Sequence, residues 1–219
     1  RFNLQHIDMP NEDKETKRLN LGCGLKKFDG FTNVDVNPLV KPDQVVDLNS
    51  YPWPWQDDEF DHIVAKDILE HLGEKPSDII KIIREMYRIS RNGALWEVQT
   101  PHWHCNTAIN DPTHVRLITL TMFDLFNKQY ILNKAQLGGS ESLIAFEADV
   151  DIEVCDYNFQ YTEPFEKRVK EKSISQEELD YSLNHLNNVA ESTRILIQVH
   201  KPGRIDMAEL QRVINARTS

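Results

Sequence analysis

The sequence predicts an α/β fold, a doubly wound sheet of mostly parallel strands. Short apolar runs with the length of buried strands occur at residues 18–21, 34–36, 45–46 and 62–65. Residues 77–89 have the spacing of an amphipathic helix, and residues 94–98 form one more apolar run. Four strands, then a helix, then a strand is an order typical of proteins with a parallel sheet.

The helix at residues 77–89 is the clearest single element. Its apolar side chains share one face and alternate with charged ones; they are Ile79, Ile82, Ile83, Met86 and Tyr87. Ser77 or Asp78 can cap its first turn, and Asn92-Gly93 ends the connection to the next strand. The proline-rich run at residues 51–58 predicts a loop.

The second half of the chain is less regular. Residues 101–120 predict a long loop, which in compact proteins is often functional. Expected helices and strands follow: a helix at 121–132, a strand at 151–161, a helix opened by the capping box Ser175-x-x-Glu178, a strand at 193–200 and a helix at 206–215. We expect an N-terminal arm, residues 1–17, and one domain, residues 18–219.

Composition narrows the class of protein. The 219 residues carry a net charge of −10, which disfavours a nucleic-acid partner because phosphate binding needs clustered Lys and Arg. Three cysteines without close spacing predict free thiols in a reducing compartment. No apolar run approaches the roughly 18 residues of a membrane helix. We therefore expect a cytoplasmic protein with a small-molecule substrate; the sequence leaves its oligomeric state open.

A glycine turn and two acids predict a nucleoside-binding edge. Gly22 and Gly24 follow the first strand and allow close backbone approach to a ligand. Asp35 and Asp47 end the next two strands, where a parallel sheet binds its ligands. The alternative is a turn that needs glycines only for its backbone. A dinucleotide fingerprint is disfavoured because its third glycine position holds Lys27 and its acid would come about 20 residues on.

Residues 18–126 resemble the class I S-adenosylmethionine (SAM) dependent methyltransferases. The segments that carry the resemblance are Leu19-Asn20-Leu21-Gly22-Cys23-Gly24, Val46-Asp47-Leu48 with Tyr51-Pro52-Trp53 and Asp58-Glu59-Phe60-Asp61, then Leu69-Glu70-His71-Leu72 and Asp111-Pro112-Thr113-His114-Val115-Arg116. The last one resembles an element of a bacterial and phage-like subgroup. Together they indicate the superfamily and identify no substrate.

The resemblance implies a Rossmann-like, mostly parallel seven-stranded sheet with one antiparallel edge strand, and SAM as cofactor. The residues it places at the cofactor are Asn20, Gly22, Cys23, Gly24, Asp35, Val36, Asp47, Leu48 and Lys66. Two departures are notable. Asn20 replaces the usual acid, and residues 25–32 leave almost no room for the family's first helix.

A histidine-rich loop follows the fifth strand and should lie over the cofactor's methyl group. It contains His102, His104 and His114 together with Cys105 and Asp111. Three interpretations stay open: a substrate pocket with a general base, structural hydrogen bonding that pins the loop, and a metal site. The spacing matches no recognised zinc motif, so none of these residues is predicted as a metal ligand.

Methyl transfer mainly requires alignment of nucleophile, methyl carbon and sulfur. A hydroxyl or amine acceptor also needs a base, and a histidine suits this role at neutral pH. We expect His114 or His102 as the base, with Asp111 or Asp67 orienting it or the substrate. Residues expected to contact substrate are His71, His104 and Arg116.

The sequence therefore predicts a SAM-dependent methyltransferase acting on an unidentified small-molecule or sugar-like acceptor. Two alternatives belong to other classes. One is a non-catalytic SAM-binding or interaction domain, suggested by Asn20 and the short first connection. The other is a metal-dependent enzyme that uses the loop from His102 to His114.

Overall fold

A seven-stranded sheet forms the centre of the computed structural model, which describes residues 16–139 and 142–218. The strands have the order β3-β2-β1-β4-β5-β7-β6. Their bounds are β1 Arg18–Leu21, β2 Thr32–Asp35, β3 Gln44–Val45, β4 Phe60–Lys66, β5 Ser90–Pro101, β6 Ile152–Tyr161 and β7 Ala190–Val199. Most of the predicted arm, residues 1–15, lies outside the described residues.

The predicted fold class is confirmed, with one difference in the position of the reversed strand. Strands β1 to β5 pair in parallel, while β7 runs antiparallel to both β5 and β6. The reversed strand is thus β7, one place in from the edge, and β6 is the edge strand. β5 and β6 run in the same direction. After β6 the chain turns back, and β7 enters the sheet between these two strands, antiparallel to both.

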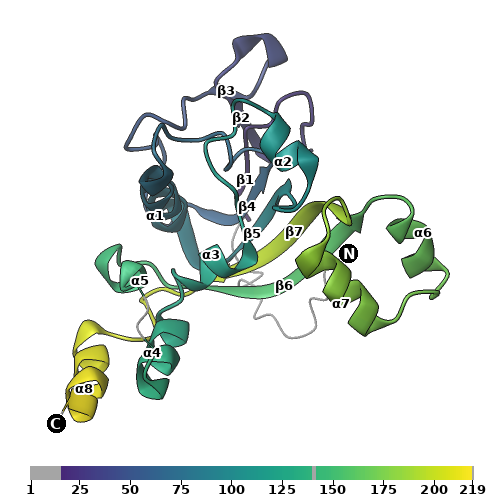
Figure 1. Ribbon diagram of the computed structural model, residues 1–219. Helices are drawn as coiled ribbons and strands as arrows, with labels where there is room; N and C mark the ends of the chain where they lie inside the picture. The colour runs from purple at the N-terminus through teal and green to yellow at the C-terminus, as the bar shows by residue number, and fades with distance from the viewer. Residues whose placement is uncertain (1–15, 140–141, 219) are drawn as a thin grey trace.

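Eight α-helices are assigned within the described residues. They are α1 Ile79–Ile89, α2 Asn106–Asn110, α3 Leu120–Asp124, α4 Lys128–Leu137, α5 Ile144–Glu147, α6 Phe165–Lys170, α7 Gln176–His185 and α8 Met207–Thr218, with short 3-10 turns η1 Pro38–Val40 and η2 Pro76–Asp78. Helix α1 lies on one side of the sheet, and α6 and α7 lie on the other, beside β6 and β7 (Figure 1). None of the helices described here is long and apolar enough to cross a membrane.

Apolar side chains of alternate strand positions pack under α1 and form the main core. Leu19, Ile63 and Trp96 are aligned across neighbouring strands and are fully buried. Ile82 and Met86 of α1 pack into the same cluster. Each such side chain stabilises the fold by about 1.5–3 kcal/mol through burial. The packing on this face therefore fixes the sheet against α1.

The predicted helix at 121–132 is two helices, α3 and α4. The Asn127 side chain accepts a hydrogen bond from the Tyr130 N–H and caps α4, while Thr119 caps α3 through the Met122 N–H. The residues between β4 and η2 form irregular turns, and the long loop contains α2. As predicted, no helix connects β1 to β2.

The register brings four loops to one edge of the sheet. Leu21 is paired with both Val34 and Ala65, and Lys66 is paired with Gln99. The segments that follow β1, β2, β4 and β5 therefore all leave the sheet at its carboxyl edge, where ligands of such sheets bind.

Candidate active site

The glycine turn after β1 brings a backbone amide to the acid of β2. Gly24 has a φ of +49° and its N–H donates to the Asp35 Oδ2 at 2.8 Å. Gly22 has a φ of +61°, and a Cβ added there would lie 2.6 Å from the Ile68 Cγ1. Both positions require glycine, because one needs a left-handed backbone and the other also has no room for a side chain.

Asn20 belongs to a buried amide network that supports the loop after β1. Its Nδ2 donates to the Asn33 Oδ1 and the Lys26 carbonyl, both at 3.0 Å. Asn33 in turn receives the Phe28 N–H at its Oδ1 and donates to the Asp43 carboxylate. These contacts order residues 22–31, where related folds have a helix. Asn20 is thereby occupied as a structural residue.

The two acids after β2 and β3 differ in what they accept. Asp35 is half-buried and accepts the N–H groups of Gly24 and Asn37. Asp47 is exposed and caps its own turn, accepting from the Asn49 N–H and the Ser50 hydroxyl. Asp35 thus has the position expected of a ribose-binding carboxylate. Asp47 shows only a local turn contact.

The residues near Asp35 and Asp47 that were predicted to contact the cofactor differ in their exposure. Val36 is 62% exposed directly after Asp35, so an apolar side chain remains accessible at this edge. Leu48 is buried, and its carbonyl accepts the indole N–H of buried Trp53 at 3.0 Å. Cys23 is also buried, which raises the pKa of its thiol. Val36 is accessible for an adenine contact, whereas Leu48, Trp53 and Cys23 fill the core.

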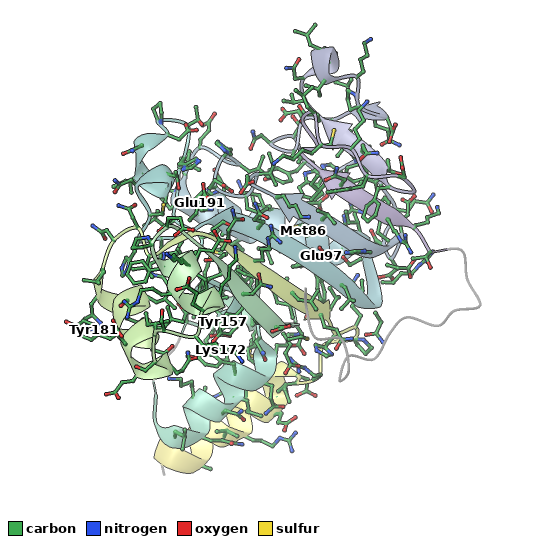
Figure 2. All side chains as sticks on the ribbon, turned by 90° about the vertical axis from the view of Figure 1, so that its right-hand side faces the viewer. Met86, Glu97, Tyr157, Lys172, Tyr181 and Glu191 are labelled. Carbon is green, nitrogen blue, oxygen red and sulfur yellow. The ribbon has the colours of Figure 1, made fainter. Side chains whose placement is uncertain are left out.

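A polar cavity of about 510 Å³ opens at the same edge, between the ends of β4 and β5 and the start of β7. Basic Lys26, Lys66 and Arg194 line it, together with Asp67 and with Glu191, which is labelled in Figure 2. Such a mixture of opposite charges at a carboxyl edge suits a polar, small ligand.

Asp67 lines this cavity with a left-handed backbone, and a chain of side-chain hydrogen bonds holds its carboxylate. Its φ is +52°, an uncommon value for a residue other than glycine. The Gln99 side chain donates to the Asp67 Oδ2 at 3.1 Å and accepts from the Arg194 Nε at 3.0 Å. Loss of solvation raises the pKa of Asp67, and the charge of Lys26 partly opposes this rise. A raised pKa makes this carboxylate a stronger base than an exposed aspartate.

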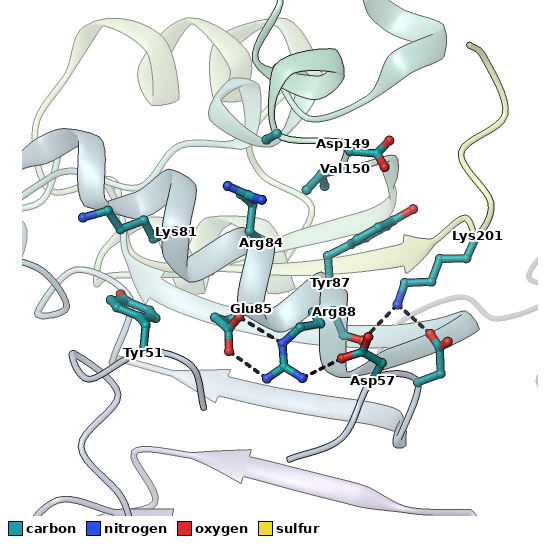
Figure 3. Close-up of a pocket in the computed structure, with 12 residues that line it drawn as sticks. Tyr51, Asp57, Lys81, Arg84, Glu85, Tyr87, Arg88, Asp149, Val150 and Lys201 are labelled. Atoms are coloured by element: carbon teal, nitrogen blue, oxygen red, sulfur yellow. Dashed lines mark hydrogen bonds and ion pairs between the residues drawn. The ribbon is translucent and has the colours of Figure 1, made fainter. Parts of the chain in front are cut away.

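A larger cavity, about 660 Å³, lies at the opposite edge of the sheet, beside the outward face of α1 (Figure 3). Two of its basic side chains are paired with acids that also line it: Arg88 binds Glu85 and Asp57, each at 2.8 Å, and Lys201 binds Asp58 at 2.6 Å. It adjoins the amino ends of β4 and β5. Since ligands of these sheets bind at the carboxyl ends, we do not assign the cofactor to it.

The histidines of the long loop do not gather in one place. His102 is fully buried and its ring stacks on Trp103 at 4.1 Å between centroids, while its Nδ1 accepts the His104 N–H. Burial lowers the pKa of His102 to about 4. The His104 ring bonds the Leu183 carbonyl of α7. These contacts favour the structural interpretation for His102 and His104.

His114 lies on the other branch of the loop, against His71. The two ring centroids are 4.6 Å apart, and the His114 Nδ1 lies 2.9 Å from the Ala108 carbonyl. Asp111 accepts from the Thr113 N–H and hydroxyl, and its Oδ2 is 3.9 Å from the His114 Nε2. His71, Asp111 and His114 therefore converge, away from His102.

Arg116 clamps the turn after β4. Its guanidinium donates to the carbonyls of Leu69 and Lys75, each at 2.9 Å, and to that of Leu72. These contacts make the Arg116 side chain a loop anchor. Glu70 belongs to the Leu69-Glu70-His71-Leu72 segment but was not predicted as a site residue. The signal that could have indicated it is a charged residue between two apolar ones.

No protein-family model matches the chain, and no curated protein matches it. Among solved structures, a SAM-dependent methyltransferase from Archaeoglobus fulgidus aligns with a TM-score of 0.50 at 16% identity, over 84% of this chain and 86% of that one. An S-adenosylmethionine-dependent methyltransferase from Mesorhizobium loti aligns with a TM-score of 0.48 at 11% identity, over 83% and 90%. The first of these likenesses shows the fold: this chain has the Rossmann-like architecture of SAM-dependent methyltransferases.

Proposed function

We propose that this protein is a SAM-dependent methyltransferase acting on a small-molecule or sugar-like acceptor. The observation that carries the proposal is the contact of the Gly24 amide with the Asp35 carboxylate at the carboxyl edge of the sheet. That pair is placed as the resemblance requires, and the polar cavity beside Asp67 opens on the same edge.

The residues of this edge fit the parts of SAM. The Asp35 carboxylate, half-exposed and already accepting hydrogen bonds, would accept the ribose hydroxyls, and Val36 would contact the adenine. The backbone of Gly22 to Gly24 would face the methionine portion. Lys26 and Lys66 supply positive charge for a carboxylate at the cavity. Asn20, Cys23, Asp47 and Leu48 would act from behind this surface by supporting its loops.

Bound SAM supplies a methyl group on a positively charged sulfur. The protein's own task is to orient the acceptor and to receive its proton. Asp67 is suited to this task because it lines the cavity and has a raised pKa. His102 would have to leave its buried stack to do the same, so we place the acceptor beside Asp67, with Gln99 holding the carboxylate.

The test is calorimetric titration with SAM and with S-adenosylhomocysteine. We expect micromolar binding by the wild type and a loss of at least about tenfold for Asp35→Asn, equivalent to about 1.4 kcal/mol. Asp29→Asn is the matched control, an exposed aspartate in the neighbouring loop. Absence of binding to correctly folded wild-type protein would refute the proposal.

A non-catalytic SAM-binding domain is the second candidate. The use of Asn20 as a loop support in place of an acid, with no helix after β1, favours it. Cofactor binding without turnover on a broad panel of hydroxyl and amine acceptors would select it. Under either candidate we propose a cytoplasmic location, in keeping with the three free thiols.

A further inference from the structure

Glu70 is a buried carboxyl group without a hydrogen-bond partner among the described residues. The residue is 2% exposed, and neither Oε1 nor Oε2 has a partner. Removing a carboxylate from water is costly unless a charge or a set of hydrogen bonds replaces the water. The arrangement therefore requires either a proton on Glu70 or a cation beside it.

Two imidazole rings face the Glu70 carboxylate. Glu70, His71 and His114 each offer one ligand atom, and the three atoms lie within 4.8 Å of one another. The His114 side chain is 9% exposed, so the group is shielded from bulk water. A carboxylate with two histidines is a donor set that divalent transition-metal ions prefer.

The hydrogen bonds around both rings leave a lone pair on each. The His114 Nδ1 bonds the Ala108 carbonyl, which only accepts, so Nδ1 carries the proton and Nε2 is free to ligate. The Thr113 hydroxyl donates its one proton to Asp111 at 2.6 Å. It therefore accepts from the His71 Nδ1 at 2.9 Å, and this ring also keeps its Nε2 lone pair. Such second hydrogen bonds are typical of metal-ligating histidines.

The loops that bear these groups are fastened to one another. The Val115 N–H donates to the Glu70 carbonyl at 2.9 Å, beside His114. Arg116 binds the carbonyls of Leu69 and Lys75 on either side of the same turn. The two imidazole rings and the backbone of Glu70 are thus held in place by contacts that do not use the ligating atoms, which reduces the cost of ordering a site.

We propose that Glu70, His71 and His114 form a binding site for one divalent transition-metal ion of the zinc type. Three protein ligands leave a coordination position open, as in zinc sites that bind water or a substrate. Asp111 supports the site through Thr113 and adds negative charge near His114. The site differs from the one considered from sequence, since it excludes His102, His104 and Cys105 and includes Glu70.

The experiment measures metal binding directly. The full chain is stripped with EDTA, desalted and titrated with ZnCl₂ by calorimetry, and in parallel with CoCl₂ by visible absorption. We expect one ion per chain, micromolar or tighter binding, and a Co²⁺ band of a four- or five-coordinate site. Glu70→Gln, nearly isosteric, and His114→Asn should each weaken binding at least about tenfold. His104→Asn is the matched control and should not.

The outcomes separate this proposal from the methyltransferase proposal. Binding weaker than about 100 μM, or binding that Glu70→Gln leaves unchanged, would overturn the metal site, because a real ligand contributes more than a factor of ten. Loss of the ion on His104→Asn or Cys105→Ser would also overturn it. Circular dichroism and SAM titration of the same samples report folding and cofactor binding, so failure of one proposal is distinguishable from failure of the other.

Discussion

His102 shows how burial decides the chemistry of one residue. Its sequence neighbours suggest a reactive loop, yet its ring stacks on Trp103, contacts Phe159 edge-to-face and is not exposed. Burial is the main cause that lowers the pKa of His102 to about 4, and the charge of nearby His104 lowers it further. The neutral imidazole is therefore the form that the folded protein stabilises.

This environment predicts a pH dependence of stability. The folded pKa of about 4 lies below the ordinary histidine pKa of 6.5, so the unfolded chain binds this proton more readily. The contribution of His102 is present above about pH 6.5 and is lost as the pH falls toward 4, by about 3 kcal/mol. Urea unfolding from pH 8 to 4 should show a smaller acid loss in His102→Asn than in the wild type.

An exposed histidine gives the control for that measurement. His185→Asn, on the surface of α7, should leave the acid slope unchanged. If the unfolding free energy of the wild type and of His102→Asn fell equally with pH, His102 would take up its proton in the folded protein as well. The assignment of His102 as a buried, neutral imidazole would then be wrong.

At the scale of elements, side-chain amides take the place of a missing helix. The connection from β1 to β2 is organised by Asn20 and Asn33, which are both nearly fully buried and bond loop carbonyls and each other. Buried amides with all their partners in place order a loop as firmly as a helix would. The glycine turn owes its position to this network.

Removing one member should therefore destabilise the fold. Asn33→Ala removes the acceptor of the Asn20 Nδ2 and the Phe28 N–H and one donor to Asp43, and a buried polar group that loses its partner costs about 1–3 kcal/mol. Denaturant unfolding should show a loss in this range, and SAM affinity should fall because the Gly24 amide shifts. The exposed Asn187→Ala is the control; an unchanged midpoint in both variants would contradict the network's role.

The turn after β4 gives a second prediction at this scale. Arg116 reaches three carbonyls with one planar guanidinium, which the single ammonium of lysine cannot copy. Arg116→Lys should lower the free energy of unfolding by about 1–2 kcal/mol and weaken zinc binding, since the Glu70 turn is released. Thermal unfolding and zinc titration check this; full zinc affinity in the variant would show that the clamp is unnecessary.

For the whole molecule, cofactor binding and folding are linked. A ligand that binds only the folded chain, at 100 times its dissociation constant, stabilises it by about 2.7 kcal/mol. The thermal midpoint of the wild type should rise accordingly with SAM, and that of Asp35→Asn should rise much less at the same concentration. Equal rises would place the cofactor away from the end of β2.

Much of the fold was predictable because its signals are local. The helix predicted at 77–89 is α1 within two residues, and the strands at 18–21 and 62–65 are present with small changes in their ends. The break between α3 and α4 was missed although Asn127 carries a capping signal, because the apolar run continues through it. Apolar spacing indicates burial but does not by itself locate a helix end.

The sequence alone determined the order of the seven strands, the place of α1, the glycine turn and the acid at the end of β2, since each depends on residues close together in the chain. Only the tertiary structure decided which side chains meet. Glu70 and His114 lie on separate loops and converge because β4 and β5 are adjacent and parallel. His102 is buried because Trp103 and Phe159 of β6 pack against its ring. Burial and convergence are produced by distant segments, so no local pattern of residues encodes them.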